Sequence, residues 1–425
     1  MQKINKKIWH IIIGGSVGNL TEWYNILLYG YLASVISQLF FPTDNPLMSL
    51  TLAFTVFALS FFVRPFGGIL FGWIGDVYGR QRALVLSLIM MAVPTFLIGC
   101  LPTYQQIGVI SPLLLCIFRV LQGLATGGEH TGSAIYLAEY APAHRRAFWV
   151  SIVPTSAAIG ILISSATALL IISSFTHKNL LVWGWRVGYW IGSLLCIISI
   201  FLRVSLPETP YFKKLQEEKL DKQYSMINLI KNKDNLKALM IVSCLSSAWG
   251  ILYQILFIWM PTYLTQVQHI SASLALQLNS AYIFLFGCLI LIVGYVADYI
   301  NRQWLLMTSC IAMAILAYPL FVLLSSGNFY EVCLAMGLFT FIFSIYLPAA
   351  FVSMIEIFNS GIRFTGLSLG FNIGLAIFGG TCPLVVTWLI AITHNNTSPA
   401  VYVILAALAG LLASLYMPNK RGKPI

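Results

Sequence analysis

The chain has 425 residues, of which 59% are apolar and only 9% are charged, and its formal net charge is +11. Because soluble proteins carry roughly 25% charged residues, this composition excludes an ordinary soluble protein. The chain is therefore expected to reside in a lipid bilayer.

Apolar runs of about 20 residues, long enough to cross the hydrocarbon core as helices, recur along the whole chain. Twelve such runs begin near Trp9, Leu50, Ala83, Ser111, Phe148, Arg186, Ala238, Ala272, Trp304, Glu331, Thr365 and Pro399. We therefore expect an all-α membrane protein with twelve transmembrane helices. A hydrophilic segment divides them into a six-helix half at residues 1–206, a cytoplasmic linker at 207–237 and a second six-helix half at 238–425.

Basic residues are distributed unevenly between the loops on the two sides of the membrane. On one side only Lys178 and Arg186 are candidates, whereas most other lysines and arginines fall on the opposite side. Since basic residues concentrate in the cytoplasm, we expect an inner-membrane protein with both termini cytoplasmic. The same rule explains the positive net charge, so nucleic acid is not an expected partner.

Two sequence patterns occur once in each half of the chain. Residues 72–80 (GWIGDVYGR) return as residues 294–302 (GYVADYINR), each time in a short loop between two apolar runs. A glutamate and an arginine seven positions apart also occur twice, as Glu139 with Arg146 and as Glu356 with Arg363. These repeats indicate two related halves, which is typical of transporters.

Charged residues inside apolar runs are the candidates for transport chemistry, since each costs on the order of 2.5–3.5 kcal/mol in a bilayer. The clearest are Glu22, Arg64, Arg119 and Glu129, all in the first half. Helical spacing places Asn19, Glu22, Asn25 and Tyr29 on one stripe, and Arg119, Gln122, Thr126, Glu129 and Ser133 on another. The stripes indicate a water-accessible cavity, although the charges would also suit simple ion pairing between helices.

The second half offers aromatic and hydrogen-bonding groups without a central charge. The resulting candidates for the substrate cavity are Asn19, Trp23, Tyr29, Arg64, Gln122, Thr126, Trp249, Tyr253, Gln254 and Asn372. The candidates for proton coupling and the substrate path are Glu22, Asn25, Arg119 and Glu129.

Metal and enzyme chemistry are not expected. The eight cysteines show no metal-ligand or redox spacing, and the apolar runs contain no constellation of nucleophile and base. We therefore expect no metal and no cofactor, with the proton as the coupling ion.

Several segments together resemble the major facilitator superfamily and, within it, the metabolite:proton symporters, especially proline/betaine transporters. The segments are residues 18–24 (GNLTEWY), 64–68 (RPFGG), 122–123 (QG), 127–129 (GGE), 138–140 (AEY), 183–186 (WGWR) and 208–210 (ETP), with Phe212, Arg363 and Asn372. They span essentially the whole chain and occur in the family's order.

The resemblance implies a twelve-helix fold of two pseudo-symmetric halves, with a cytoplasmic latch at Asp76, Arg80 and Arg82. It also implies that Arg119 and Glu129 belong to the coupling machinery and that Glu22 lines the substrate path. Ion pairs of this kind form and break as two rigid halves rock. The candidate cytoplasmic gate contains Asp76, Arg80, Arg82, Glu139, Arg146, Asp298, Arg302, Glu356 and Arg363.

The chain departs from the family pattern at a few positions. Asn25 stands where family members usually carry an aspartate, and His130 stands where tyrosine is common. Residues 187–188 (VG) replace an isoleucine-proline pair, and Asn301 replaces the glycine of the second loop. Because Asn25 lacks a carboxylate, the sequence leaves open whether this chain has the family's usual proton coupling and its usual substrate.

The expected function is a proton-coupled symporter that imports a small zwitterion such as proline or betaine by alternating access, and that works as a monomer. An organic acid such as citrate or 2-oxoglutarate is the alternative substrate. An uncoupled facilitator or exporter is the second mechanism, and a non-transporting membrane sensor or enzyme is the third class.

Overall fold

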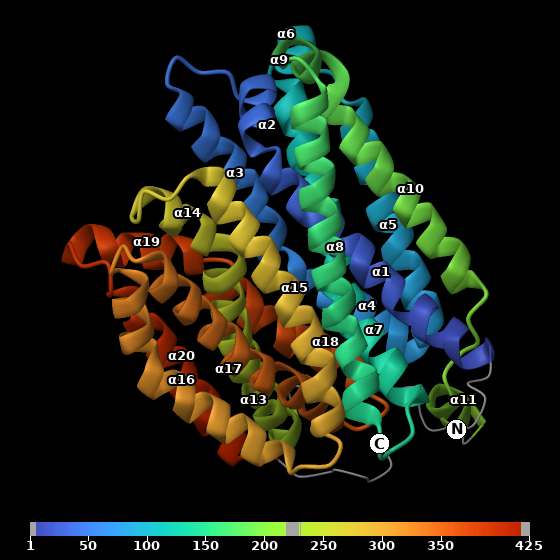
Figure 1. Ribbon diagram of the computed structural model, residues 1–425. Helices are drawn as coiled ribbons and strands as arrows, with labels where there is room; N and C mark the ends of the chain where they lie inside the picture. The colour runs from blue at the N-terminus through green and yellow to red at the C-terminus, as the bar shows by residue number, and fades with distance from the viewer. Residues whose placement is uncertain (1–5, 218–228, 230, 418–425) are drawn as a thin grey trace. The chain divides into compact units, whose positions relative to one another are not determined.

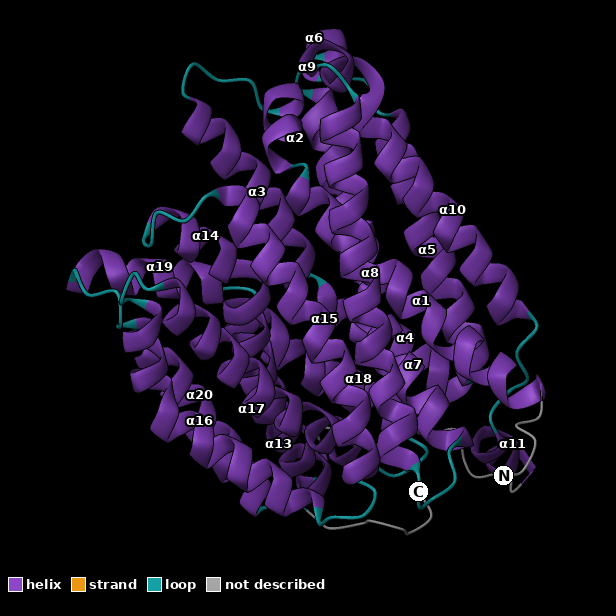
Figure 2. Cartoon of the chain, viewed as in Figure 1, coloured by secondary structure: helices purple, strands orange, loops and turns teal. Residues whose placement is uncertain are grey.

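The computed structural model describes residues 6–217, 229 and 231–417. In these residues the regular structure consists of helices joined by loops (Figure 2). Residues 218–228 and 230 of the predicted linker lie outside the described residues.

The helices of the first 217 residues are α1 (Lys6–Tyr31), α2 (Ala33–Phe40), α3 (Pro46–Phe62), α4 (Arg64–Val77), α5 (Arg80–Cys100), α6 (Tyr104–Ile107), α7 (Ile110–Tyr140), α8 (Arg146–Ser174), α9 (His177–Asn179), η1 (Leu180–Gly184), α10 (Trp185–Val204) and α11 (Pro210–Glu217). Those that follow are α13 (Lys233–Tyr253), η2 (Gln254–Trp259), α14 (Met260–Gln266), α15 (Ala272–Val296), α16 (Arg302–Leu324), α17 (Phe329–Glu356), α18 (Arg363–Gly374), η3 (Leu375–Gly379), α19 (Cys382–Thr393) and α20 (Pro399–Leu415).

Ten helices in the described part of the chain are long and apolar enough to cross a membrane. The two remaining predicted spans correspond to α1 and α20. The helix α1 has 26 residues, but its polar stripe lowers its hydropathy, and α20 has only 17 residues. The predicted all-helical, multi-pass membrane protein is thus confirmed, with ten of the twelve expected spans meeting the length and hydropathy of a span.

The chain forms two compact units. The first contains Met1–Leu137 and Ser156–Lys222, and the second contains Ala138–Thr155 and Gln223–Ile425. The end of α7 and the first turns of α8 therefore belong with the later part of the chain. As a result, Glu139 and Arg146, which come from the first sequence repeat, lie in the second unit.

In the first unit, α5 and α10 run side by side (Figure 1). The helices α4 and α7 also approach closely, because glycine stands at their contact. A Cβ atom at Gly127 would lie 2.3 Å from the carbonyl oxygen of Arg64, which no real side chain tolerates. The small residues of the fourth apolar run thus allow the helix that carries Arg64 to come close.

In the second unit, α16 lies beside both α17 and α20, and α13 packs on α18. Ser243 and Ser246 of α13 donate hydrogen bonds to the carbonyl of Gly370 at 3.1 and 3.3 Å. Two wider turns, the π-helices η2 and η3, interrupt the spans that begin at α13 and α18. The amide of Asn279 donates to the carbonyl of Phe257 within η2 at 3.1 Å, so a side chain supplements the altered backbone bonding there.

Candidate functional site

The polar stripe of α1 is buried in the first unit. Its four members are each at most 2% exposed: Asn19, Glu22, Asn25 and Tyr29. The Tyr29 hydroxyl donates to the carbonyl of Ala53 at 3.0 Å, and the Asn25 amide donates to the carbonyl of Thr21, one turn earlier, at 3.0 Å. Two of the four groups therefore satisfy backbone carbonyls, and Glu22 carries the only charge of the stripe.

Glu22 is fully buried and lies 3.6 Å from Arg64 of α4, measured from Oε1 to Nη2. That separation is an ion pair but exceeds hydrogen-bond distance. In the described part of the chain, neither carboxylate oxygen of Glu22 accepts a hydrogen bond. A buried carboxylate with both oxygens unbonded is costly, so this site has capacity for a proton or a donor.

The guanidinium groups of Arg64 and Arg119 stand at opposite ends of an aromatic pair. Arg64 lies over the ring of Phe61 at 4.4 Å, and Arg119 lies over the ring of Phe57 at 5.5 Å. The two rings are 5.3 Å apart. Arg119 also lies over Tyr29 at 4.4 Å. Cation–π contacts of this kind help to hold buried arginines in place.

Arg119 is a buried cation with neutral hydrogen-bond partners. Its Nη1 donates to Gln122 and its Nη2 donates to Ser60, both at 3.0 Å. Gln122 in turn donates to Thr95 at 2.8 Å, which fixes the orientation of its amide. Among the described residues, no carboxylate lies within 4.0 Å of Arg119. An uncompensated charge in this position favours the binding of an anionic group.

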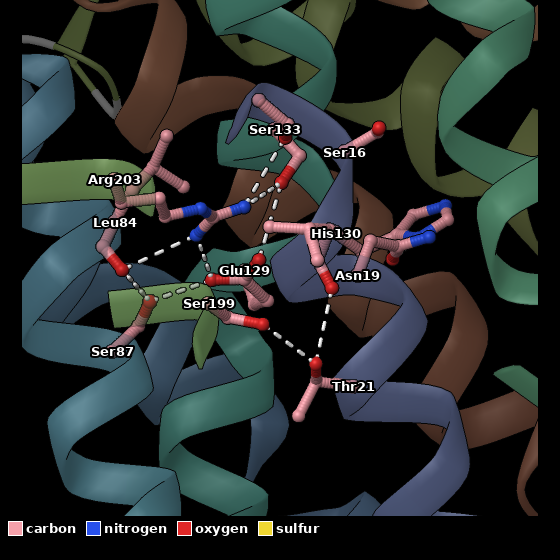
Figure 3. A network of polar contacts seen from close by, with 12 residues as sticks. Ser16, Asn19, Thr21, Leu84, Ser87, Glu129, His130, Ser133, Ser199 and Arg203 are labelled. Atoms are coloured by element: carbon pink, nitrogen blue, oxygen red, sulfur yellow. Dashed lines mark hydrogen bonds and ion pairs between the residues drawn. The ribbon is translucent and has the colours of Figure 1, made fainter. Parts of the chain in front are cut away.

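Glu129 of α7 pairs with Arg203 of α10 at 2.6 Å, and both side chains are fully buried. Figure 3 shows the network around them, in which Ser87 and Ser133 also donate to the Glu129 carboxylate at 2.8 and 3.2 Å. Arg203 donates to Ser133 as well, at 2.7 Å. Glu129 and Arg119 therefore have different partners in the same unit.

Next to Glu129, His130 shares a hydrogen bond with Asn19 of α1 at 2.6 Å. Asn19 donates onward to Ser156 of α8 at 3.2 Å. Thr21 and Ser199 add a further contact between α1 and α10 at 2.8 Å (Figure 3). The polar groups of α1 thus connect it to three neighbouring helices.

Thr126 and Trp23 are two further candidates from the sequence in the first unit. The Thr126 hydroxyl donates to the carbonyl of Gly123 in its own helix at 2.8 Å. Trp23 packs edge-on to His130, with ring centroids 6.4 Å apart, and lies 5.9 Å from the Arg64 guanidinium. Trp23 is thus the candidate that borders the Glu22 and Arg64 pair.

Two of the four candidates of the second unit, Trp249 and Tyr253, lie in an aromatic cluster. Trp249 lies 4.7 Å from Phe371 and 5.8 Å from Tyr253, measured between ring centroids. Gln254 is buried at the first position of η2. The Asn372 amide donates to the carbonyl of Ser368, one turn earlier in its own helix, at 2.7 Å.

The charged residues of the two Glu-to-Arg repeats form a cluster in the second unit, and each repeat forms ion pairs with the other. Arg363 donates to Glu139 at 3.0 Å, whereas Arg146 donates to Glu356 at 2.6 Å. Arg302 also donates to Glu356, at 2.5 Å. Each glutamate of the repeated pattern is therefore bonded to the arginine of the other copy.

The two repeated loops are each held by a carboxylate that caps a helix. In the first unit, Asp76 pairs with Arg80 at 3.0 Å, and Glu208 accepts hydrogen bonds from the backbone N–H groups of Arg80 and Gln81 at 3.1 and 3.2 Å. Arg82, the third latch candidate, is exposed. Burial raises the pKa of the Glu208 carboxyl above its ordinary value, and its hydrogen bonds offset part of that effect.

In the second unit Asp298 lies 3.7 Å from Arg302 and caps the first turn of α8. Burial also raises the pKa of Asp298, against the opposing effects of its backbone hydrogen bonds and of Arg302.

The family model of the Major Facilitator Superfamily matches residues 20–374 of the chain. The chain belongs to this superfamily. It is accordingly a membrane transporter of the Major Facilitator Superfamily, and the pair of related sequence halves is the repeat expected of such a protein.

Relatives of this superfamily member align with nearly all of this chain and with more than four-fifths of their own length. A glycine betaine/proline/ectoine/pipecolic acid transporter of Dickeya dadantii is 31% identical over 97% of this chain and 84% of its own. The proline/betaine transporter of Escherichia coli K12 is 30% identical over 99% and 85%. A putative proline/betaine transporter of Staphylococcus aureus is 32% identical over 97% and 88%.

Solved structures of the superfamily share the fold. The proton:xylose symporter XylE, bound to 6-bromo-6-deoxy-D-glucose, superposes with a TM-score of 0.82 at 18% identity, over 99% of this chain and 98% of the other. The Escherichia coli fucose:proton symporter FucP gives a TM-score of 0.68 at 14% identity, over 97% and 98%. At these identities the likeness shows the major facilitator fold alone.

Sequence reasoning missed two groups of this transporter. Arg203 reads as one more basic residue at the end of an apolar run, although its side chain turns inward to Glu129. Glu208 was noted only as part of a motif, although it caps α5. The position of Arg203 in the last turn of α10 gives no separate signal, because basic residues at the ends of spans also mark the cytoplasmic side.

Proposed function

We propose that this transporter is a proton-coupled symporter of a small zwitterion, such as proline or glycine betaine, in a bacterial inner membrane. The relatives described above are named for these solutes, and two proteins of the same fold are named proton symporters. Its partners would be the solute, protons and the surrounding lipid, and it would use no other cofactor. Both termini would be cytoplasmic, and the protein would work as a monomer.

The observation that carries this proposal is that the first unit holds a buried carboxylate, Glu22, and a buried guanidinium, Arg119, that do not pair with each other. A zwitterion presents a carboxylate and a cationic nitrogen, and it needs one partner for each. Among the described residues, Arg119 has no carboxylate within 4.0 Å, and the carboxylate of Glu22 accepts no hydrogen bond. Arg119 would receive the carboxylate of the solute through charge-assisted hydrogen bonds.

Glu22 is the proposed proton carrier. When Glu22 is ionised, its attraction to Arg64 is satisfied only by a long contact of 3.6 Å. Taking up a proton removes a buried negative charge, and releasing it restores the ion pair, so the two protonation states differ in how they hold α1 against α4. Alternating access of the whole protein would then proceed with the proton bound or released.

An organic acid is a second candidate substrate, because Arg64 and Arg119 supply two buried guanidinium groups at the ends of the Phe57 and Phe61 pair. A dicarboxylate such as 2-oxoglutarate would use both. Uncoupled transport is the remaining alternative, since Asn25 supplies no carboxylate where the family usually has one.

The test is uptake of labelled proline, glycine betaine, citrate and 2-oxoglutarate by proteoliposomes, with and without an imposed inward pH gradient. Protein-free liposomes and the variant Glu22→Gln serve as controls. We expect one zwitterion to accumulate above its external concentration only when the gradient is present, and Glu22→Gln to equilibrate it without accumulation. Accumulation of an acid instead would replace the substrate class, and uptake indifferent to the gradient would contradict symport.

A further inference from the structure

We infer that Arg203 is a positioning residue that holds Glu129 as a fixed, ionised partner, so that Glu22 is the carboxylate of the first unit that exchanges the coupling proton. This inference rests on the proposed function, because it assigns the proton step within it.

The Glu129 carboxylate accepts three hydrogen bonds, with at least one on each oxygen. Oε2 accepts from Arg203 at 2.6 Å and from Ser87 at 2.8 Å, and Oε1 accepts from Ser133 at 3.2 Å. One of these donors is a guanidinium group, so the carboxylate has a counter-charge as well as two neutral donors. Neutralising Glu129 would leave the buried guanidinium of Arg203 without that counter-charge.

Arg203 is in turn fixed by backbone groups of two other helices. Its guanidinium donates to the carbonyls of Gly14 and Gly15 in α1 at 3.1 and 3.2 Å, and to the carbonyl of Leu84 in α5 at 3.2 Å. Figure 3 shows Arg203 lying between Leu84 on one side and Ser133 on the other. The pair therefore joins α1, α5, α7 and α10 in one arrangement, which suits a permanent structural contact.

A glycine in α1 makes room for this pair. A Cβ atom at Gly18 would lie 2.4 Å from Oε1 of Glu129 and 2.5 Å from Cζ of Arg203. The backbone of α1 therefore covers the ion pair directly, and neither side chain can change its position without moving that helix.

Glu22 differs from Glu129 in each of these respects. Its oxygens accept no hydrogen bond from the described residues, and its cationic neighbour Arg64 stands at 3.6 Å. The charged groups that act on Glu22 are Arg64 from α4, Glu129 from α7 and Arg203 from α10, and His130 of α7 lies against the neighbouring Trp23. Around Glu129 they are Arg203 from α10, Glu22 from α1 and His130 on its own helix, while α5 contributes the hydroxyl of Ser87.

The first experiment compares Glu129→Gln, Arg203→Gln and the double variant Glu129→Gln/Arg203→Gln in full-length protein. Thermal unfolding in detergent measures stability, and gradient-driven uptake in proteoliposomes measures coupling. We expect each single variant to unfold at a lower temperature, because it leaves one buried charge without its partner. The double variant should recover most of that loss, and it should accumulate the solute with the pH profile of the wild type.

The matched comparison is Glu22→Gln, which should remain folded, exchange solute across the membrane and lose accumulation. If the double variant folds but fails to accumulate the solute, Glu129 carries the proton and the inference is wrong. If both single variants are as stable as the wild type, Arg203 has no positioning role.

Ser87→Ala provides an alternative test if the Arg203 variants do not fold. Removing this donor leaves both charges in place but takes one hydrogen bond from the Glu129 carboxylate. A fixed pair predicts a modest loss of stability and an unchanged pH profile of uptake, whereas a Glu129 that exchanges the coupling proton predicts a changed profile. If wild-type protein shows no gradient-driven accumulation at all, the proposed function fails, while the stability comparison still decides the role of Arg203.

Discussion

The carboxylate of Asp298 accepts a hydrogen bond from the backbone N–H of Ala147 at 2.8 Å, and Phe148 donates a second one at 3.0 Å. The second repeated loop thereby caps the N-terminus of α8, where the helix dipole also favours a negative charge. The same residue lies beside Arg302, so one carboxylate serves a helix terminus and an ion pair together.

The raised pKa of Asp298 predicts how stability changes with pH. A raised carboxyl pKa means that the folded protein holds this proton more tightly than the unfolded chain does. The stability that it contributes is complete below the unfolded pKa, about 3.9, and is lost as pH rises through the folded value. The stability of the wild type relative to Asp298→Asn should therefore increase as the pH is lowered from about 7 towards about 4. Thermal unfolding across that range is the measurement, and a decrease on acidification would mean that the bonds to the ionised form dominate.

The pair of Glu139 and Arg363 is expected to act as a unit. Removing either charge breaks a buried ion pair, at a cost of about 3–5 kcal/mol. We predict that Glu139→Gln and Arg363→Gln each slow uptake, and that the double variant is no slower than the worse single one. Initial rates per folded transporter test this, and additive losses would argue against a direct functional pair.

Substitution of Arg119 should weaken binding of solutes that carry a carboxylate. Because a hydrogen bond to a charged group contributes about 1.5–3 kcal/mol, Arg119→Gln should raise KM about tenfold to a hundredfold. Arg119→Lys retains the charge but lacks the planar guanidinium group, so its KM should lie between those of the wild type and Arg119→Gln. Uptake kinetics decide this, and a KM equal to that of the wild type in Arg119→Gln would place the carboxylate elsewhere.

Asp76→Asn should slow turnover several-fold without changing which solute is recognised, since Asp76 pairs with Arg80 outside the candidate cavity residues. Competition for uptake by unlabelled solutes measures the recognition profile. A changed profile in this variant would contradict the latch assignment.

Gly127→Ala should destabilise the first unit by about 1–3 kcal/mol, because its new Cβ would meet the backbone of Arg64. Gly337→Ala is the matched control in a helix with room, where the nearest atom to a Cβ lies 3.7 Å away. Thermal unfolding of the two variants should differ clearly, and equal stability would show that α4 and α7 separate at little cost.

The sequence alone located the helices well. Each predicted run begins within about five residues of a helix start, for example near Ala272 and Pro399, where α15 and α20 begin, and near Ala238, where α13 begins at Lys233. The burial of the α1 stripe also followed from its spacing. Both features depend on hydropathy and periodicity, which are local properties of the chain.

The partners of the polar residues were much harder to predict. Asn372 and Thr126 donate hydrogen bonds to carbonyls of their own helices. The spacing of residues in the sequence cannot distinguish such a side chain from one that contacts a ligand. Glu129 finds Arg203, 74 positions away, because four helices converge there. Basic residues at the ends of spans also mark the cytoplasmic side, so the inward turn of Arg203 has no distinct signature.

The exchange of partners between the two copies of the Glu-to-Arg pattern has an evolutionary consequence. Glu139 pairs with Arg363 and Arg146 pairs with Glu356, so a charge change in one copy of the pattern breaks a pair with the other copy. A substitution in one copy is therefore best tolerated when the other copy changes with it. Reciprocal charge pairing of this kind is expected to make the two copies vary together in evolution.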